Sequence, residues 1–349
     1  LDPFTTNLVV ADPSRGAGAI CLAITPAMKA LGIRNRCRVF EIPKGVEYIT
    51  ALPRMRRYME VSAEIYGVYL RYISPEDIHV YSIDECFIYA TPYLNMYSMH
   101  PKQLAQELMD AVFRQTHITA TAGVATNLFL AKIALDITAK HVPDHIGWLD
   151  EDSFRKRLWH HRPITDFWNI GAGTARRLEK YGVYDLLGVC WLDPEVLYRE
   201  FGVNAEYLID HAHGVEPCTI AQIQAYVPQG SSLQQGQVLQ CPYDHDRAHT
   251  VMREMVDTLV LDLVDKRLVA GGISLVVGYE IPREARMAAA SAFQGEHGRA
   301  YWKAIPRAGG SHKLGGYTSS AKKLVAAFEE LWAETIDPDA QIRRMSVAA

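Results

Sequence analysis

The sequence predicts a multidomain α+β protein, and three observations carry that prediction. The chain has 349 residues with an ordinary globular composition, 49% hydrophobic and 22% charged, which leaves room for roughly two to four domains. Strand and helix patterns alternate as far as residue 148, and helical patterns then fill residues 150–216. Strands and helices return afterwards, so we expect two α+β regions separated by a helical one.

Composition and cysteine usage narrow the class of protein. Because no apolar run approaches the ~18 residues of a membrane span and no secretory signal opens the chain, we expect a soluble, cytoplasmic protein without membrane contact. Six cysteines are scattered without a Cys-x-x-Cys pair, which favours free thiols. His160–His161 and the pair His245 and His249 lack the further ligands of a zinc site. The chain starts at Leu1 rather than Met, and we expect a fragment trimmed at both ends.

The first fifty residues predict a small module of strands with one helix. Residues 7–11 and 19–24 are apolar runs separated by a turn, and each is expected to form a strand. A helix is expected from Pro26, ending at Gly32, because proline suits the first turn and glycine the left-handed end of a helix. A further strand is expected at residues 38–42.

Residues 53–148 predict one mostly antiparallel sheet backed by helices. The apolar spacing is helical after Pro53, alternates around residue 80, and becomes helical again beyond residue 100. The expected elements, in order, are a helix at 55–70, strands at 78–83 and 86–89, a helix at 104–113, a strand at 118–125, and a helix capped by Thr126 that runs to Pro143.

Asp84 and Glu85 are the first candidates for chemistry. They interrupt two β-rich segments, where burying carboxylates is costly unless a turn exposes them or a cation pairs with them. Mg²⁺ takes hard oxygen ligands and often shares them with substrate phosphates, so a strand-to-strand turn with two acids can be a magnesium site. The alternative is an ordinary solvated Asp-Glu hairpin turn.

A glycine-containing turn in the helical region predicts a phosphate-binding site. Gly171 and Gly173 permit close approach of the backbone, and the start of the following helix, near Thr174, offers free N–H groups to an anion. Arg176 and Arg177 add cationic side chains, as in a helix-hairpin-helix that binds DNA phosphates without reading sequence. The alternative is a plain link between two helices.

The C-terminal region predicts a second α+β unit after a link at residues 221–230. The net charge of the chain is −4, yet residues 283–323 hold eight lysines and arginines against two glutamates. Such a local excess, which includes Arg283, Arg286 and Lys313, is typical of a phosphate-binding face, although a basic solvated loop would look the same. The expected elements are strands at 233–239 and 273–281, a helix at 248–268 before a turn at Gly271 and Gly272, the basic loop, a helix at 324–331, and a strand from Ile342.

Taken together, these motifs resemble the Y-family DNA polymerases along the whole chain. The segment Tyr81-Ser82-Ile83-Asp84-Glu85 is highly characteristic, and Leu130-Ala131-Lys132-Ile133-Ala134 and the turn at Gly171 support it. Within that family the chain is most similar to the UmuC-like (ImpB/MucB/SamB) branch, which includes the UvrX-type proteins.

The resemblance implies a right-hand polymerase that copies past damaged bases in DNA repair and the SOS response. It implies fingers at 1–52 with a remnant of a palm strand, a ferredoxin-like palm at 53–148 and a helical thumb with the helix-hairpin-helix at 149–220. A linker at 221–230 and an α+β little finger at 231–349, truncated at its last strand, would complete the chain.

The resemblance also implies the site and its partners. Asp84 would bind both of two Mg²⁺ ions, Glu85 would support the metal-activated primer 3′-hydroxyl, and Lys29 and Lys140 would contact the incoming triphosphate. Primer-template DNA and deoxynucleoside triphosphates would be the ligands, with a sliding clamp or other replication or repair protein as a possible partner. The family takes a third acid from an Asp on the first palm strand, expected before Leu1, so residues 1–349 are expected to lack activity.

Two other functions fit the same residues. A DNA-binding module without catalysis would use the hairpin and the basic segment, and a structure-specific nuclease would use the hairpin together with magnesium carboxylates. Primer extension, DNA binding without extension, and Mg²⁺-dependent cleavage of branched DNA distinguish the three.

Overall fold

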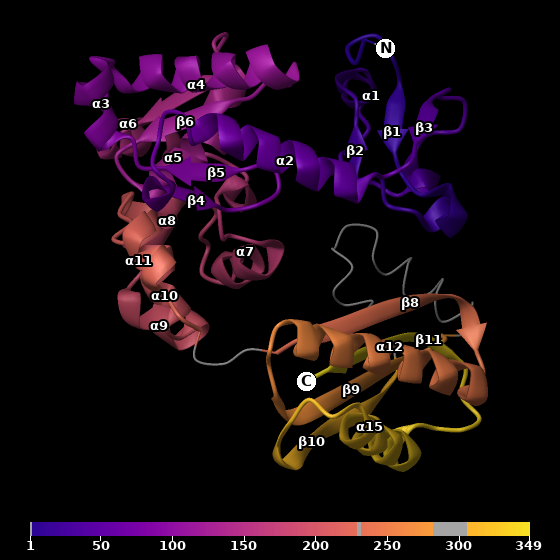
Figure 1. Ribbon diagram of the computed structural model, residues 1–349. Helices are drawn as coiled ribbons and strands as arrows, with labels where there is room; N and C mark the ends of the chain where they lie inside the picture. The colour runs from indigo at the N-terminus through magenta and orange to yellow at the C-terminus, as the bar shows by residue number, and fades with distance from the viewer. Residues whose placement is uncertain (1, 229–231, 282–305) are drawn as a thin grey trace. The chain divides into compact units, whose positions relative to one another are not determined.

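The computed structural model describes residues 2–228, 232–281 and 306–349, and the chain forms two compact units at 1–227 and 228–349 (Figure 1). Both units mix helices and strands, which confirms the expected α+β class. Short 3₁₀ segments lie between the main elements, at Pro13–Gly18, Val39–Glu41, Pro75–Asp77, Ala139–His141 and Ile164–Asp166.

The first unit begins with a three-stranded sheet in the order β2–β1–β3. Strand β1 (Leu8–Val10) is antiparallel to β2 (Ala23–Ile24) and parallel to β3 (Ile49–Ala51). Helix α1 (Pro26–Ala30) starts at proline, and Gly32 follows it at φ 78°, as the sequence predicts.

The strand expected at residues 38–42 is wrong, because Val39–Glu41 forms a 3₁₀ turn. The Glu41 carboxylate accepts the Arg38 backbone N–H at 2.7 Å, which satisfies a donor that a strand would have to pair elsewhere. A local side-chain bond of this kind competes with sheet formation.

The next part of the unit carries the acidic turn between two strands. Strands β4 (Ile78–Val80) and β5 (Cys86–Ile88) pair antiparallel, with Val80 opposite Cys86. Three helices surround them in sequence, namely α2 (Met55–Tyr69), α3 (Thr91–Tyr97) and α4 (Pro101–Thr116). Leu104, Leu108 and Val112 of α4 lie in the local cores, in agreement with the helical spacing of the sequence. In α2 the buried residue is Val68, whereas the periodic apolar residues Met55 and Met59 are exposed.

A second strand pair, β6 (Ala122–Ala125) and β7 (Ile146–Leu149), is parallel and places Gly123 opposite Gly147. Residues 128–141 between them are helical, with α5 (Leu128–Ile133), a π-helical turn (Ala134–Thr138) and the 3₁₀ turn Ala139–His141. A Cβ added at Gly123 would overlap the Ala131 carbonyl, and one at Gly147 would overlap the Ala134 carbonyl. The two glycines therefore let the backbone of this helix lie directly on both strands.

Two expectations for this region are corrected. The expected single antiparallel sheet is instead two strand pairs, one antiparallel and one parallel, because β7, which was not predicted, returns beside β6. The residue that caps α5 is Asn127 rather than Thr126, since the Asn127 Oδ1 accepts the Leu130 N–H at 2.8 Å. The Thr126 hydroxyl donates to Glu151 instead, at 2.7 Å.

Helices fill residues 151–213, as the sequence predicts, and a further helix lies at Ile220–Ala225, where a link is expected. Asp150 caps the first of them through the Ser153 N–H at 2.7 Å, with Glu151 and Asp152 in its first turn. The helices are α6 (Glu151–Leu158), α7 (Ala172–Glu179), α8 (Leu186–Trp191), α9 (Pro194–Phe201), α10 (Asn204–His213) and α11 (Ile220–Ala225).

The second unit is an antiparallel sheet in the order β10–β9–β11–β8 with two helices on one face (Figure 1). Its apolar core lies between the helices and that face of the sheet, and includes Leu259, Leu275, Phe328 and Val347. The elements are β8 (Gln234–Tyr243), α12 (His245–Asp265), β9 (Ala270–Tyr279), β10 (Arg307–Thr318), α15 (Ala321–Thr335) and β11 (Ile342–Ala348).

Two expectations for the second unit are also corrected. Gly271 and Gly272 do not form the turn after α12 but lie inside β9, and the chain reverses earlier, where Arg267 adopts φ 55°. Lys313 lies on strand β10 rather than in a basic loop. Among the described residues, none of the helices combines the length and apolar character needed to cross a bilayer.

We expect Gly147→Ala to lower the free energy of unfolding of the first unit by about 2 kcal/mol, because the new methyl group would overpack against a helix backbone that cannot rotate away. Urea unfolding followed by circular dichroism measures the change. Gly67→Ala is the matched control, since a Cβ at this position in α2 meets nothing within 4 Å and should stabilise slightly. Equal midpoints for Gly147→Ala and the parent would contradict the prediction.

Candidate active site

The acidic turn is a closed five-residue link between β4 and β5. The backbone N–H groups of Tyr81 and Ser82 both donate to the Glu85 carbonyl, at 3.0 and 3.1 Å. The Ser82 hydroxyl donates to Asp84 Oδ1 at 2.8 Å, which orients a carboxylate that is otherwise exposed. The turn thus presents the oxygens of Asp84 to solvent and directs Glu85 toward the protein.

A buried lysine pairs with the second carboxylate of the turn. Lys132, on α5, places its Nζ 2.8 Å from Glu85 Oε2 and 3.1 Å from Asp136 Oδ1, and its side chain is only 8% exposed. Burial alone would lower the pKa of Lys132, but hydrogen bonds and charges from Glu85 and Asp136 outweigh burial and raise the pKa. Burying a carboxylate is costly unless a cation pairs with it. The Lys132 ammonium group provides such a cation for Glu85.

Sequence reasoning missed the role of Lys132 and Asp136. Their i, i+4 spacing on one helix was the available signal, because residues four apart lie on the same face. The partner Glu85 is distant in sequence, so no spacing rule could have found it.

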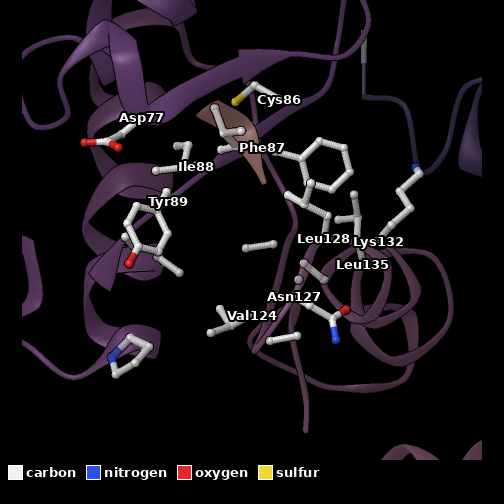
Figure 2. Close-up of a pocket in the computed structure, with 18 of the residues that line it drawn as sticks. Asp77, Cys86, Phe87, Ile88, Tyr89, Val124, Asn127, Leu128, Lys132 and Leu135 are labelled. Carbon is white, nitrogen blue, oxygen red and sulfur yellow. The ribbon is translucent and has the colours of Figure 1, made fainter. Parts of the chain in front are cut away.

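A cavity of about 910 Å³ lies next to the carboxylate turn (Figure 2). Every residue of 85–89 and of 122–125 lines it, although side chains on a strand alternate between faces. Consecutive lining residues mean that strand edges, and not strand faces, border the cavity. Within the described residues β5 pairs only with β4 and β6 only with β7, so each has an unpaired edge there.

The cavity has charged groups at the end near the turn and a mostly apolar wall elsewhere. Glu85 and Lys132 lie at that end, and Asp77 and Glu216 also line the cavity. The apolar wall includes Phe87, Ile88, Val124 and Leu128. Burial raises the pKa of the neighbouring Cys86 thiol to about 11, so this cysteine is a neutral, unreactive part of the wall.

The two lysines expected at a triphosphate lie on separate elements. Lys29 is exposed in the last turn of α1. Lys140 is exposed at the end of the helix that carries Lys132, and it borders a second cavity of about 410 Å³ with Asp136, His141, His161 and Asp166. Because Asp136 also binds Lys132, this second cavity adjoins the ion pairs of Lys132 with Glu85 and Asp136. The roles of both lysines stay predictions.

The glycine turn of the helical region is an open helix N-terminus. Gly171 is the N-cap of α7, and an added Cβ there would meet nothing within 4 Å. Gly173 and Thr174 lie inside the first turn of α7 and not in the link before it. The Thr174 N–H donates to the Gly171 carbonyl at 3.0 Å. The open space beside Gly171 would permit an anion to approach the helix start, as the hypothesis of a phosphate site requires.

The cations expected at that hairpin already have protein partners. Arg177 donates to the Glu200 carbonyl at 2.7 Å, and its guanidinium lies 4.2 Å from the centre of the Phe201 ring. Arg176 reaches the Ala172 carbonyl at 3.3 Å. Lys313 is exposed on β10, while Arg283 and Arg286 lie outside the described residues. These DNA contacts also stay predictions.

We expect Lys132→Met to destabilise the first unit by about 2 kcal/mol, because it leaves Glu85 partly buried beside Asp136 without a cation. Urea unfolding measures the change. Lys102→Met is the matched control, since the exposed pair of Lys102 with Asp144, at 3.7 Å, should contribute less than about 0.5 kcal/mol. Equal losses in both variants would contradict a special role for Lys132.

The sequence of the first part of the chain matches a known family. Residues 3–136 match the impB/mucB/samB family, a range that contains the acidic turn, Lys132 and Asp136. The chain is 30% identical over 283 residues to the Bacillus subtilis protein named UV-damage repair protein UvrX, covering 80% of this chain and 66% of that one. It is 28% identical over 256 residues to DNA polymerase IV 2 of Halalkalibacterium halodurans, covering 72% and 60%. The chain thus spans about two thirds or less of the length of these two curated relatives.

Solved structures share the fold. A Y-family DNA polymerase chimera of Dbh and Dpo4 matches with a TM-score of 0.71 at 19% identity, covering 99% of this chain and 91% of that one. A ternary complex of Dbh DNA polymerase matches with a TM-score of 0.53 at 18% identity and the same coverage. These likenesses confirm the expected right-hand polymerase fold. With its family domain at residues 3–136, the chain belongs to the impB/mucB/samB family.

Proposed function

We propose that this chain is the polymerase part of a lesion-bypass, DNA-directed DNA polymerase. The observation that carries the proposal is the turn of Asp84 and Glu85, in which one carboxylate is exposed and oriented while the other is held on a buried lysine. The family and the relatives named for DNA polymerase IV and UV-damage repair support the same activity. In this proposal residues 1–52 are fingers, 53–148 palm, 149–220 thumb and 231–349 little finger.

The donor set of the turn fits Mg²⁺. Carboxylate oxygens are the ligands that Mg²⁺ prefers, and Asp84 offers them to solvent in a fixed orientation. When bound, a pair of such ions would activate the attacking 3′-hydroxyl and stabilise the charge that develops on the leaving group. Asp84 would bind both ions, and Glu85 would turn from Lys132 toward the primer side, leaving Lys132 paired with Asp136.

We further propose that a β-strand with a third acid completes the site in the cavity between β5 and β6. Two carboxylates seldom hold two divalent ions, and among the described residues no three His, Cys, Asp or Glu side chains are grouped as metal ligands. A strand bonded to both unpaired edges would fill the apolar part of the cavity and end beside Glu85. The first palm strand of the family, with its Asp, has the required chemistry.

The nucleic-acid contacts of the proposal follow the same residues. Primer-template DNA would place a phosphate at the N-terminus of α7, at Gly171, Gly173 and Thr174, with Arg176 and Arg177 nearby. Lys29 and Lys140 would contact the triphosphate of the incoming nucleotide. Lys313 on β10, together with Arg283 and Arg286, would bind backbone phosphates through the second unit.

A DNA-binding module without catalysis is the second candidate. It is favoured by one observation, namely that the described residues bring only two acids to the turn and pair one of them with Lys132. Phosphate binding at α7 needs neither a metal ion nor a third acid, so this function would remain if the strand site were never filled.

In a protein that carries residues 1–349 together with the proposed strand, we expect Asp84→Ala to reduce primer extension by about a hundredfold or more, because the shared metal ligand is lost. Gel electrophoresis of an extended primer with Mg²⁺ and all four deoxynucleotides measures it. Asp339→Ala, a change near the end of the second unit, is the control and should leave extension unchanged. Unchanged extension in Asp84→Ala would refute the assignment of the site.

For residues 1–349 alone we expect binding to primer-template DNA without appreciable nucleotide incorporation, because the described residues group no three acids as metal ligands. Gel-shift titrations at rising salt should show affinity that falls as phosphate contacts are screened. Efficient incorporation by residues 1–349 would contradict the need for a third acid, and the absence of any DNA binding would contradict both candidate functions.

A further inference from the structure

A tryptophan from the helical region is bonded to the start of the acidic turn. The Trp168 indole N–H donates to the Tyr81 hydroxyl at 3.0 Å. The two rings pack edge to face with centroids 5.7 Å apart, and the Phe87 ring lies 5.7 Å from Tyr81 and 6.1 Å from Trp168. Tyr81, Phe87 and Trp168 form an aromatic cluster beside the turn, and its third ring comes from a segment distant in sequence.

Trp168 is itself held from its other side. Its ring stacks on His211 with centroids 6.2 Å apart, and His211 stacks on the buried Phe129 at 4.1 Å. His211 Nε2 lies 2.9 Å from Glu216 Oε2, with both side chains less than a tenth exposed. A ring fixed in this way can act as an anchor, because moving it would disturb a buried hydrogen-bonded pair.

The cluster also reaches the two carboxylates of the turn. Tyr81 N–H donates to the Glu85 carbonyl at 3.0 Å, so the position of Tyr81 sets one end of the turn. The Lys132 ammonium, which binds the Glu85 carboxylate, lies 5.8 Å from the centre of the Tyr81 ring. A displaced Tyr81 would therefore move both the backbone of the turn and the cation that orients Glu85.

Trp168 lies just before the helix start that is the candidate phosphate site. Asn169 follows it at φ 67°, Ile170 is buried, and Gly171 is the N-cap of α7. This short segment therefore joins the aromatic cluster to the N-terminus of α7 through a buried side chain and a constrained backbone.

We propose that Trp168 is a positioning residue for the Asp84 and Glu85 carboxylates and fixes them relative to the N-terminus of α7. It acts through Tyr81, to which its indole N–H is bonded. This proposal rests on the proposed function, since it assigns the geometry of the same metal site. It predicts that the indole N–H matters for metal affinity and for the order of the turn, and not only for the stability of the fold.

The test compares Trp168→Phe, Tyr81→Phe and the double variant of residues 1–349 with Trp191→Phe, a matched control because Trp191 is 81% exposed. Mn²⁺ affinity is measured by electron paramagnetic resonance, with Asp84→Ala as the reference for loss of the site. Hydrogen exchange of the peptide covering 78–88 is measured in parallel, with a peptide from β9 as internal control.

We expect each single variant to bind Mn²⁺ about two- to tenfold more weakly than the parent, which is the effect of one net hydrogen bond. The double variant should bind Mn²⁺ no more weakly than the single variant with the lower affinity, since both changes remove the same hydrogen bond. Exchange at 78–88 should become faster by a similar factor in all three, while β9 and the Trp191→Phe variant stay at the parent values.

An unchanged rate of hydrogen exchange at 78–88 in Trp168→Phe and Tyr81→Phe would overturn the inference, regardless of the Mn²⁺ affinities. The inference would also be overturned if Trp168→Phe and Tyr81→Phe bound Mn²⁺ as tightly as Trp191→Phe does, while Asp84→Ala lost Mn²⁺ binding. If Asp84→Ala binds Mn²⁺ as the parent does, the metal site of the proposed function fails instead, and the exchange result alone then decides whether Trp168 orders the turn.

Discussion

The contact on which the site depends is the close packing of a helix backbone on two glycines. Gly123 and Gly147 are direct partners in the β6–β7 pair, and each faces a backbone carbonyl of the helix that starts at Leu128. With any side chain at either position the helix would move outward. Lys132 lies on this helix, and its Nζ is 2.8 Å from Glu85 Oε2. This distance requires the close position of the helix that the two glycines permit. A backbone contact remote from the chemistry thus sets the position of the charge beside the acidic turn.

The charge balance at the turn follows from that arrangement. One ammonium group serves two carboxylates, Glu85 and Asp136, and Asp84 stands exposed beside them, so the local charge remains negative. A solvated hairpin would not place a lysine that is 8% exposed against one of its acids, because burying an ammonium group is costly without such partners. The alternative of an ordinary solvated hairpin turn therefore accounts for Asp84 but not for Glu85.

Much of the architecture was predictable from the sequence, and the failures have common physical causes. Long periodic helices such as α2 and α12 and the strand pair around the turn were found because each has a local signal. Strand β7 and the split into two strand pairs were not found, because four apolar residues give little pattern and strand pairing is decided at long range. The cap of α5 was misplaced by one residue, since Thr126 and Asn127 are both good caps and only the fold selects between them.

The candidate site shows the same division between local and long-range information. Asp84 and Glu85 were identified from their own segment, whereas Lys132 and Trp168 contact the turn from positions 47 and 87 residues away. The turn is thus fixed by its own backbone bonds, by an ammonium group and by an indole, which come from three parts of the chain. Catalytic geometry needs supports that do not move together with the reacting groups, and distant segments of one unit provide them. The short acidic motif is ambiguous in sequence because these supports lie elsewhere in the chain.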